Sequence, residues 1–468
     1  MKHLYSLVGA CLSAALLAAC GGSNGFFSSA PMSVAPQIAA PQSAAAASAS
    51  QRLEPSLRRP LKSRTEKVLY SFKGLPKGDG ANPQADLTFL NGALYGTTSQ
   101  GGRDTKQCSE YTGCGTVFEV STSGTESVIY SFKGAPDGAN PYADLTTISG
   151  ELYGTTEMGG KISSVTNGGT AFKVSTSGTE SVIYTFKGGN ANDGLYPLAG
   201  LIAVKGVLYG TMFEGGSGGD GTVYEVNSSG TESVLHSFTG GGYYKLPDGG
   251  FPQAGLVSLD ATLYGTTADG GGTTCVEGDG TSGCGTIFSV STSDNESIVY
   301  RFKGGKTGAY PSAGLINVKG TLYGTTAGGG DPGPGSGGCS GSVAFGCGTI
   351  FSVSTSGTEH VLHKFKGGSD GWGPLAGLIV VKGTLYGTTA SGGSSGCNSY
   401  GCGTLFKVST TGAGYSVLYR FTGGSDGARP YASLVDVNGT LYGTTAYGGG
   451  STNCHDGDGC GTVFELAP

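Results

Sequence analysis

Charged side chains are scarce in this chain. They make up 13% of its 468 residues, and the net charge is -6. A surface that binds nucleic acid needs clustered Lys and Arg to neutralise phosphate groups, so this composition excludes nucleic acid as a partner. The sequence also lacks an HExxH zinc helix, a phosphate-binding loop and a nucleophile elbow between a strand and a helix. It therefore gives catalysis little support.

Glycine is abundant instead, with 91 residues. It follows no triplet period, which excludes collagen, and the runs of Val, Ile, Leu, Phe and Tyr between the glycines can bury a core. The composition predicts an all-β protein with many tight turns.

The first 20 residues predict export. An apolar run over residues 4–19 has the length of a signal peptide rather than of a transmembrane helix. It ends in "LAAC", which resembles the bacterial lipobox and predicts lipidation of Cys20. An ordinary cleavage site after small residues is the alternative. Gly21 follows Cys20, and by resemblance to the sorting rules of Gram-negative bacteria the lack of Asp at that position favours the outer membrane over the inner one.

Three regions are therefore expected. Residues 1–19 form the lipoprotein signal peptide, and residues 20–66 form the lipidated cysteine and a flexible tether rich in Ala, Ser, Pro and Gln. A random coil of this length reaches roughly 35 to 40 Å. Residues 67–468 form the folded domain, which would stand off a membrane of the cell envelope.

Four short runs recur along the folded region, each rich in β-branched and aromatic residues. The run "LYGTT" and its variants return at spacings of 55 to 63 residues, which indicates a repeat architecture. The others resemble "GTVFEV", "VLYSFKG" and "GLIAVKG", and turn residues bound them all, as is typical of strands. The "LYGTT" run begins at Leu94, Leu152, Leu208, Leu263, Leu322, Leu385 and Leu441.

The joints between the runs predict how the strands connect. Asn91-Gly92 and its equivalents separate "GLIAVKG" runs from "LYGTT" runs by two residues, the signature of a β-hairpin. Ser123-Gly124 and its equivalents predict the same two-residue turn between the "GTVFEV" and "VLYSF" runs. Four strands linked in this way form an antiparallel meander, which is a propeller blade.

The order of the runs predicts a closed ring. The folded region begins with an outer-strand run at Val68 and ends with a third-strand run at Gly461, so the last blade lacks an outer strand. Pairing the first segment with the last blade removes the exposed edges. An open solenoid would need polar capping repeats, and none is visible. We expect a seven-bladed β-propeller of four-stranded antiparallel blades.

The combination of "LYGTT", "GTVFEV" and "SFKG" at this period resembles the bacterial tandem-repeat family called GloVer, over residues 67–468. The resemblance implies an exported protein with a surface anchor. It implies no activity and no catalytic residues.

Ten cysteines of the folded region form five close pairs, all between the second and third strands of a blade. In an exported protein such pairs predict disulfides. Metal binding is the alternative, but the spacings vary and His455 is the only histidine in these loops. The loops of blades 2 and 3 have no pair. The predicted disulfides join Cys108 to Cys114, Cys275 to Cys284, Cys339 to Cys347, Cys397 to Cys402, and Cys454 to Cys460.

The loops that enter the blades share an Asp-Gly pair followed by a proline, with Thr307-Gly308 in blade 5. Aspartate before glycine favours a turn in which the carboxylate accepts backbone N–H groups. A ring of calcium ligands is the alternative, although each loop offers one carboxylate. No cofactor or metal is otherwise expected. The pairs are Asp79-Gly80, Asp137-Gly138, Asp193-Gly194, Asp248-Gly249, Asp370-Gly371 and Asp426-Gly427.

Recognition should use positions that differ between the repeats on one face. The residue before each proline is such a position, and the loops of blades 3 and 4 add aromatic and charged residues. Such a face suits sugar rings or a peptide; packing onto the blade core is the alternative. The candidate ligand-binding residues are Tyr196, Phe213, Glu214, Tyr243, Tyr244, Lys245, Phe251, Tyr310, Trp372 and Arg429.

Three functions follow as hypotheses for a chain expected to be monomeric. The first is a surface-anchored binding module for glycans, extracellular polymer or a protein. The second is an enzyme for saccharides or peptides that uses carboxylates from different blades. The third is a structural part of a cell-envelope complex. His236 and His363 occupy an outer-strand position that is Tyr in other blades, so packing is expected for them.

Overall fold

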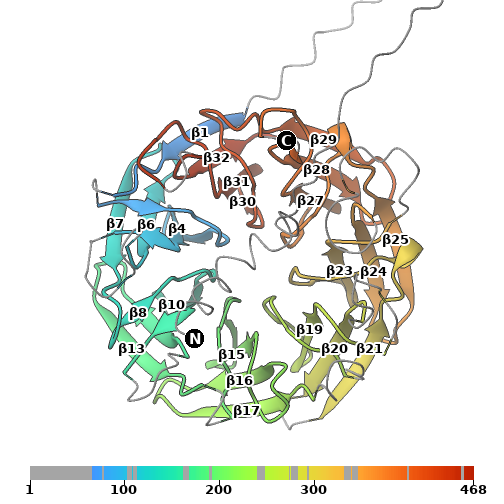
Figure 1. The fold of residues 1–468 in the computed structure, drawn as a ribbon, viewed down its shortest axis with the longest axis horizontal. Helices are drawn as coiled ribbons and strands as arrows, with labels where there is room; N and C mark the ends of the chain where they lie inside the picture. Colours follow the sequence, from blue (N-terminus) through green and yellow to red (C-terminus); the bar gives the residue numbers. More distant parts are fainter. Residues whose placement is uncertain are drawn as a thin grey trace, which may run out of the picture. The chain divides into compact units, whose positions relative to one another are not determined.

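The described residues of the computed structural model form seven four-stranded antiparallel sheets, set around an axis as the blades of a ring (Figure 1). The predicted seven-bladed propeller is confirmed. The chain divides into two units, residues 1–63 and 64–468, and every described residue belongs to the second. The predicted lipidation site Cys20 lies outside the described residues. These are residues 66–75, 78–102, 108, 113–161, 168–188, 192–239, 248–272, 275, 283–291, 295–330, 339, 346–397, 400–454 and 458–468.

Each blade uses the four recurring runs in chain order, from the axis to the rim. The inner strands are β3 (Thr88–Leu90), β9 (Thr146–Ile148), β14 (Ile202–Val204), β18 (Val257–Leu259), β22 (Ile316–Val318), β26 (Ile379–Val381) and β30 (Val435–Val437). The second strands are β4 (Ala93–Thr98), β10 (Glu151–Thr156), β15 (Val207–Met212), β19 (Thr262–Thr267), β23 (Thr321–Thr326), β27 (Thr384–Thr389) and β31 (Thr440–Thr445).

The outer half of each blade is built in the same way. The third strands are β6 (Thr116–Ser121), β12 (Thr170–Val174), β16 (Thr222–Val226), β20 (Thr286–Ser291), β24 (Thr349–Ser354), β28 (Thr404–Ser409) and β32 (Thr462–Leu466). The rim strands are β7 (Glu126–Ser131), β13 (Glu180–Thr185), β17 (Glu232–Ser237), β21 (Glu296–Arg301), β25 (Glu359–Lys364), β29 (Ser416–Arg420) and, for blade 7, β1 (Glu66–Ser71).

The two ends of the folded unit close the ring. Strand β1 pairs antiparallel with β32, with Glu66 opposite Leu466 and Ser71 opposite Thr462. In Figure 1 the blue first strand lies beside the red last strand, so blade 7 is shared by both ends of the unit. The predicted closure is confirmed.

The turns agree with the sequence at one joint and differ at the other. Asn91 and Gly92 have φ angles of 52° and 90°, as a two-residue type I′ hairpin requires, so this prediction is confirmed. The two-residue turn predicted at Ser123-Gly124 is wrong. Ser121 N–H donates to Thr125 O and Gly124 N–H to Ser121 O, which makes a three-residue loop. A type I turn followed by a left-handed glycine matches strand twist equally well.

Aromatic side chains join each blade to the next. Phe72 at the end of the rim of blade 7 lies edge-on against Phe118 of blade 1, with ring centroids 5.0 Å apart, and both are fully buried. The pattern recurs at every blade junction. These contacts place the hydrophobic core between the blades rather than at the ring axis.

The "LYGTT" run is scaffold in this core. Gly96 lies so close to Phe118 that a Cβ built on it would be 2.6 Å from the ring's Cζ. Thr98 and Thr116 share a hydrogen bond of 2.8 Å within the blade, and the Thr97 hydroxyl donates to Ala143 O of the next blade at 2.9 Å. The run is therefore repeated because it joins strands and blades.

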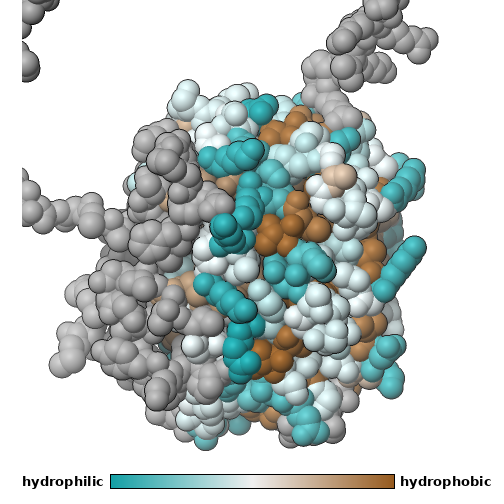
Figure 2. All heavy atoms as spheres, turned by 90° about the vertical axis from the view of Figure 1, so that its right-hand side faces the viewer, coloured by the Kyte–Doolittle hydropathy of each residue, from teal (hydrophilic) through white to brown (hydrophobic). Residues whose placement is uncertain are grey.

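The rim is mixed in polarity. On the side shown in Figure 2, hydrophobic residues form small patches separated by hydrophilic side chains. Among the described residues, no helix is long and apolar enough to cross a membrane.

Candidate functional site

Two sets of loops meet on one face of the ring. Each loop that enters a blade pairs with the loop between the second and third strands of that blade. In blade 1, β2 (Gly80–Ala81) pairs with β5 (Gln100–Gly101), and in blade 2, β8 (Gly138–Ala139) pairs with β11 (Met158–Gly159). Single bridges do the same in the other five blades. These pairings place both sets of loops on one face, which we call the loop face.

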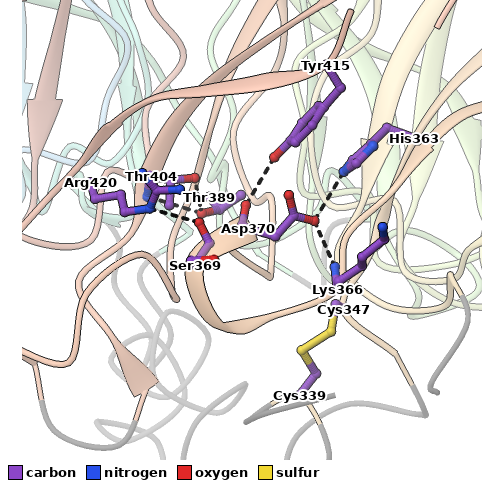
Figure 3. Close-up of polar contacts among 10 residues, drawn as sticks. All are labelled: Cys339, Cys347, His363, Lys366, Ser369, Asp370, Thr389, Thr404, Tyr415 and Arg420. Atoms are coloured by element: carbon purple, nitrogen blue, oxygen red, sulfur yellow. Dashed lines mark hydrogen bonds and ion pairs between the residues drawn. A yellow bond between two sulfur atoms is a disulfide. The ribbon is translucent and has the colours of Figure 1, made fainter. Parts of the chain in front are cut away.

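Aspartates of the Asp-Gly pairs close the turns that lead onto this face. In Figure 3, Asp370 accepts a hydrogen bond from the Lys366 N–H at 2.9 Å and lies 3.2 Å from the ring nitrogen of His363. The other five aspartates accept equivalent backbone bonds. The turn interpretation is thus confirmed. His363 also stacks on Tyr415, with centroids 3.4 Å apart, so it packs at the rim as expected.

The residue before each loop proline has a left-handed backbone. All seven have φ angles between 55° and 61°, a region that bulky side chains rarely adopt. Arg429 shows why the conformation is held: its N–H donates to Cys402 O of blade 6, and its C=O accepts the Ala446 N–H of blade 7. Each non-glycine residue of this kind costs about 1–3 kcal/mol of strain and marks a candidate functional position. They are Asn82, Asn140, Tyr196, Phe251, Tyr310, Gly373 and Arg429.

The segment after each proline points alternate side chains toward the ring axis. In blade 1, Pro83, Ala85 and Leu87 are buried, while Gln84 and Asp86 are partly exposed. Because side chains of an extended chain alternate, the partly exposed pair faces the same way. The position of Asp86 recurs in every blade next to the inner strand, and we call this set the axial ring. Its members are Asp86, Asp144, Gly200, Gly255, Gly314, Gly377 and Ser433.

Members of the axial ring touch from blade to blade. The Ser433 N–H donates to Asp86 at 2.6 Å, and a Cβ on Gly200 would overlap the carboxylate of Asp144. A Cβ on Gly255 would lie 3.6 Å from Gly200 O, and the next two glycines repeat the spacing at 3.5 Å. The ring is therefore bare backbone over blades 3 to 6 and carries polar side chains on blades 7, 1 and 2.

Two carboxylates meet in the axial ring. Burial, followed by the charge of Asp86, raises the pKa of Asp144 to about 7, although the hydrogen bond from the Gly200 N–H acts in the opposite direction. Burial also raises the pKa of Asp86. Neighbouring carboxylates of this kind share protons near neutral pH. These two carboxylates lie within electrostatic reach of each other on neighbouring blades.

Five further residues gather on the loop face above blades 7, 1 and 2, and we call them the polar arc. The Arg429 guanidinium lies 5.6 Å from the Tyr447 ring centroid and 3.4 Å from the Tyr431 hydroxyl. Tyr447 and Glu157 both raise the pKa of Tyr142, after the larger effect of burial, so these groups lie within electrostatic reach of one another. The polar arc comprises Tyr142, Glu157, Arg429, Tyr431 and Tyr447.

Glu157 differs from its equivalents in the other blades, which are Ser, Phe or Ala. Its side chain is 3% exposed, and burial alone raises its pKa to about 7. Its backbone N–H donates to Asn140 O, which fixes it at the start of the blade 2 loop. Within the described part of the chain, its carboxylate accepts no hydrogen bond.

The structure brings some of the predicted binding residues together and separates others. Phe213 and Phe251 lie 5.2 Å apart and join the loop faces of blades 3 and 4. Trp372 is 6% exposed and faces Tyr400 of its own blade instead, at 6.1 Å. Tyr196 and Tyr310 hold the left-handed positions of blades 3 and 5, and Glu214 bridges Leu195 beside Tyr196. Tyr243, Tyr244, Lys245 and His455 lie outside the described residues.

Five disulfides join the predicted cysteine pairs, with Cα atoms 5.0 to 5.3 Å apart. The second cysteine of each pair accepts the N–H of a left-handed residue in the next blade, as Cys402 does from Arg429. The disulfides therefore support the loop face directly. No group of three or more His, Cys, Asp or Glu suited to a metal occurs among the described residues.

Sequence reasoning missed the axial carboxylates and four members of the polar arc. The sequence did contain a signal for the axial carboxylates, because the third residue after the loop proline is Asp in two repeats, Gly in four and Ser in one. Glu157 was also visible as the only acidic residue at its position in the seven repeats, and Tyr447 as the only aromatic residue at its position. Their proximity was not, because it depends on how the blades close.

One family model matches this chain over most of its length. The sequence model of the Gloeobacter/Verrucomicrobia repeat matches residues 58–277 and 272–468. No curated protein matches the chain.

Solved structures with a similar arrangement share little sequence. TolB from Acinetobacter baumannii is 14% identical over 64% of this chain and 58% of its own, with a TM-score of 0.32. The GH74 enzyme of Niastella koreensis is 13% identical over 74% of this chain and 46% of its own, with a TM-score of 0.41. A luciferin-regenerating enzyme is 12% identical over 68% and 88%, with a TM-score of 0.37.

Proposed function

The chain belongs to the Gloeobacter/Verrucomicrobia repeat family, and from that premise we propose that it is a surface-anchored binding module whose loop face takes an extracellular glycan. One observation carries the proposal: aromatic and charged side chains occupy strained left-handed positions on one face. Tyr196, Phe251 and Arg429 keep φ angles of 55° to 59° where Gly373 serves blade 6 without strain. Strain kept at positions that differ between repeats supports a role in recognition.

The chemistry of the loop face suits a polyhydroxylated ligand. Phe251 is partly exposed and packs on the buried Phe213, so it offers a flat apolar surface of the kind that packs against the faces of sugar rings. The phenols of Tyr142 and Tyr431 and the carboxyl of Glu157 offer donors and acceptors for hydroxyl groups. Apolar and polar parts lie on different blades, so one ligand can engage both across the axis.

A glycan array with the purified protein tests the proposal. We expect binding to at least one class of extracellular polysaccharide, and Phe251→Gly should weaken it at least tenfold. Glycine is the natural residue of blade 6 at this position, so the change relieves backbone strain and should leave the fold intact. Val380→Ala, at an exposed residue of inner strand β26, serves as a control away from the loop prolines. An array without any signal would contradict the proposal.

The anchor is part of the same proposal. Lipidation of Cys20 would hold the propeller at the outer membrane by a tether of roughly 35 to 40 Å. Cys20→Ser should move the protein from the membrane fraction to the soluble fraction and abolish incorporation of labelled fatty acid. Unchanged fractionation of the variant would contradict the anchor and leave the glycan proposal standing.

A second candidate function is hydrolysis of a glycan, which the Asp86 and Asp144 pair favours. Paired carboxylates with shifted pKa values can serve as the acid and the base of glycoside cleavage. Turnover of the bound glycan should fall at least a hundredfold in Asp144→Asn, with binding retained. Asp436→Asn, on an exposed residue of inner strand β30, is the control. If the parent protein binds the glycan but does not hydrolyse it, the hydrolysis hypothesis is contradicted and the binding function remains.

A further inference from the structure

Arg429 is a cation that lies within electrostatic reach of the exposed Asp458 but makes no direct contact with a carboxylate of the described residues. No ion pair forms to it within 4.0 Å there, and its single side-chain hydrogen bond is the long contact to Tyr431. A guanidinium has five N–H donors in a planar fork that matches a carboxylate. Arg429 is partly buried and lies over the Tyr447 ring, which fixes the guanidinium in place. Most of its N–H donors have no hydrogen-bond acceptor among the described residues.

Glu157 is the complementary group of the polar arc. Glu157 is 3% exposed and accepts no hydrogen bond from the described residues, so its carboxyl has lost most of its hydration at a cost in free energy. Tyr142 of the same blade lies within electrostatic reach of it, because the charge of Glu157 adds to the effect of burial in raising the pKa of Tyr142. A ligand hydroxyl that donates to Glu157 would remove this cost.

Tyr142 and Tyr447 connect the two unpartnered groups. They come from blades 2 and 7, on either side of blade 1, and Tyr447 lies under the guanidinium. A ligand that spans them therefore meets a cation at one end, a buried carboxyl at the other and two phenols between. A ring that carries both a carboxylate and hydroxyl groups has this pattern.

We propose that the polar arc recognises an acidic saccharide, a uronic acid unit whose carboxylate binds the Arg429 guanidinium and whose hydroxyls bind Glu157 and Tyr142. The inference rests on the proposed glycan-binding function and names its ligand class. Because burial raises the pKa of Glu157 to about 7, its carboxyl is largely neutral in slightly acidic medium and does not repel the ligand. Neutral saccharides would satisfy Glu157 and leave Arg429 unpaired.

Calorimetric titration of the purified protein with three tetrasaccharides tests the ligand class. Oligogalacturonate carries carboxylates, maltotetraose is neutral, and a chitosan tetramer is cationic. We expect oligogalacturonate to bind at least tenfold more tightly than the other two. Equal or tighter binding of either of the others overturns the inference and leaves the proposed function standing. If no saccharide binds in these titrations or on the glycan array, both fail.

Variants locate the contact. Arg429→Gly places at this position the residue that blade 6 carries, so it is compatible with the fold, and it should reduce the affinity for oligogalacturonate at least tenfold. Arg429→Lys keeps the charge but loses the fork, and should show an intermediate loss. Arg420→Gln, on the rim at a residue that donates to Ser369 O, removes an equal charge elsewhere and should have no effect (Figure 3). Unchanged affinity in Arg429→Gly would overturn the assignment.

Discussion

At the scale of single residues, blade 3 carries two buried hydroxyl groups that lack a hydrogen-bond partner within the described chain. Tyr224 replaces the phenylalanine of the other six third strands, and its buried hydroxyl has no hydrogen-bond partner within the described chain. Met212 replaces a threonine, so the hydroxyl of Thr222 loses the partner that its equivalents have at 2.7 to 2.8 Å. The departures in "LYGTMFEGG" thus cost stability inside the blade, next to a loop that carries Phe213.

Tyr224→Phe should stabilise the protein. Removing an unpaired buried hydroxyl while keeping the ring restores the side chain of the other blades, and we expect a gain of about 1 kcal/mol in the free energy of unfolding. Urea denaturation measures the change. The reverse substitution, Phe172→Tyr in blade 2, should cost about 1–3 kcal/mol because it buries a hydroxyl where the parent has none. A destabilised Tyr224→Phe would mean that the hydroxyl has a partner after all.

At the scale of elements, glutamates link neighbouring rim strands. Six of the seven rim strands begin with Glu, and in each one Oε1 is buried without a hydrogen bond from the described residues. The Tyr184 hydroxyl shows the arrangement: it lies 3.1 Å from Asp193 and 3.4 Å from Glu232 of the next rim strand. One phenol proton cannot satisfy two carboxylates, so the second needs a proton of its own. The six are Glu66, Glu126, Glu180, Glu232, Glu296 and Glu359.

The rim glutamates predict that stability falls as pH rises. Burial, followed by the charge of Asp193, raises the pKa of Glu232 from 4.5 to about 7. The folded chain therefore holds this proton more tightly than the unfolded chain does, so the stabilisation is complete below pH 4.5 and is lost as pH rises through 7. Glu232→Gln, which keeps the neutral form at every pH, should be more stable than the parent at pH 8.

Urea titrations between pH 4.5 and 8 measure this effect. The parent should lose stability across the window, and Glu232→Gln should lose less. Glu119→Gln is the control, on a third-strand glutamate away from these links. Two histidine–aspartate pairs, His363 with Asp370 and His236 with Asp248, affect stability at lower pH. Despite burial, each histidine holds the pKa of its aspartate below the ordinary value. A parent whose stability rises from pH 4.5 to 8 would contradict the proton-sharing link.

Elements were more predictable than the contacts between them. Turn chemistry places Asn91-Gly92 in a hairpin because both residues must have positive φ angles, which few others accept. The same reasoning was wrong by one residue at Ser123-Gly124, since a type I turn followed by a left-handed glycine has a similar sequence. Nothing local predicts that Asp86 and Asp144, in different repeats, share an electrostatic environment. That depends on the radius of the ring.

At the scale of the whole molecule, closure places the two ends of the folded unit in one blade. Blade 7 contributes Arg429, Tyr431 and Tyr447 to the polar arc, and its rim strand β1 comes from the start of the unit. The candidate site and the ring closure are therefore connected. Loss of β1 would expose an edge of β32 and also loosen the blade that carries Arg429.

Deletion of residues 64–72 should destabilise the protein and weaken ligand binding together. The deletion removes the pairing with β32 and the fully buried Phe72, whose side chain alone is worth about 3–5 kcal/mol. A lower midpoint of thermal unfolding and self-association in size-exclusion chromatography are the expected readouts, because an open edge of β32 can pair with another chain. Deletion of residues 21–63, which belong to the other unit, should change neither the midpoint of thermal unfolding nor the oligomeric state. A monomeric, equally stable protein without residues 64–72 would show that the ring does not need this closure.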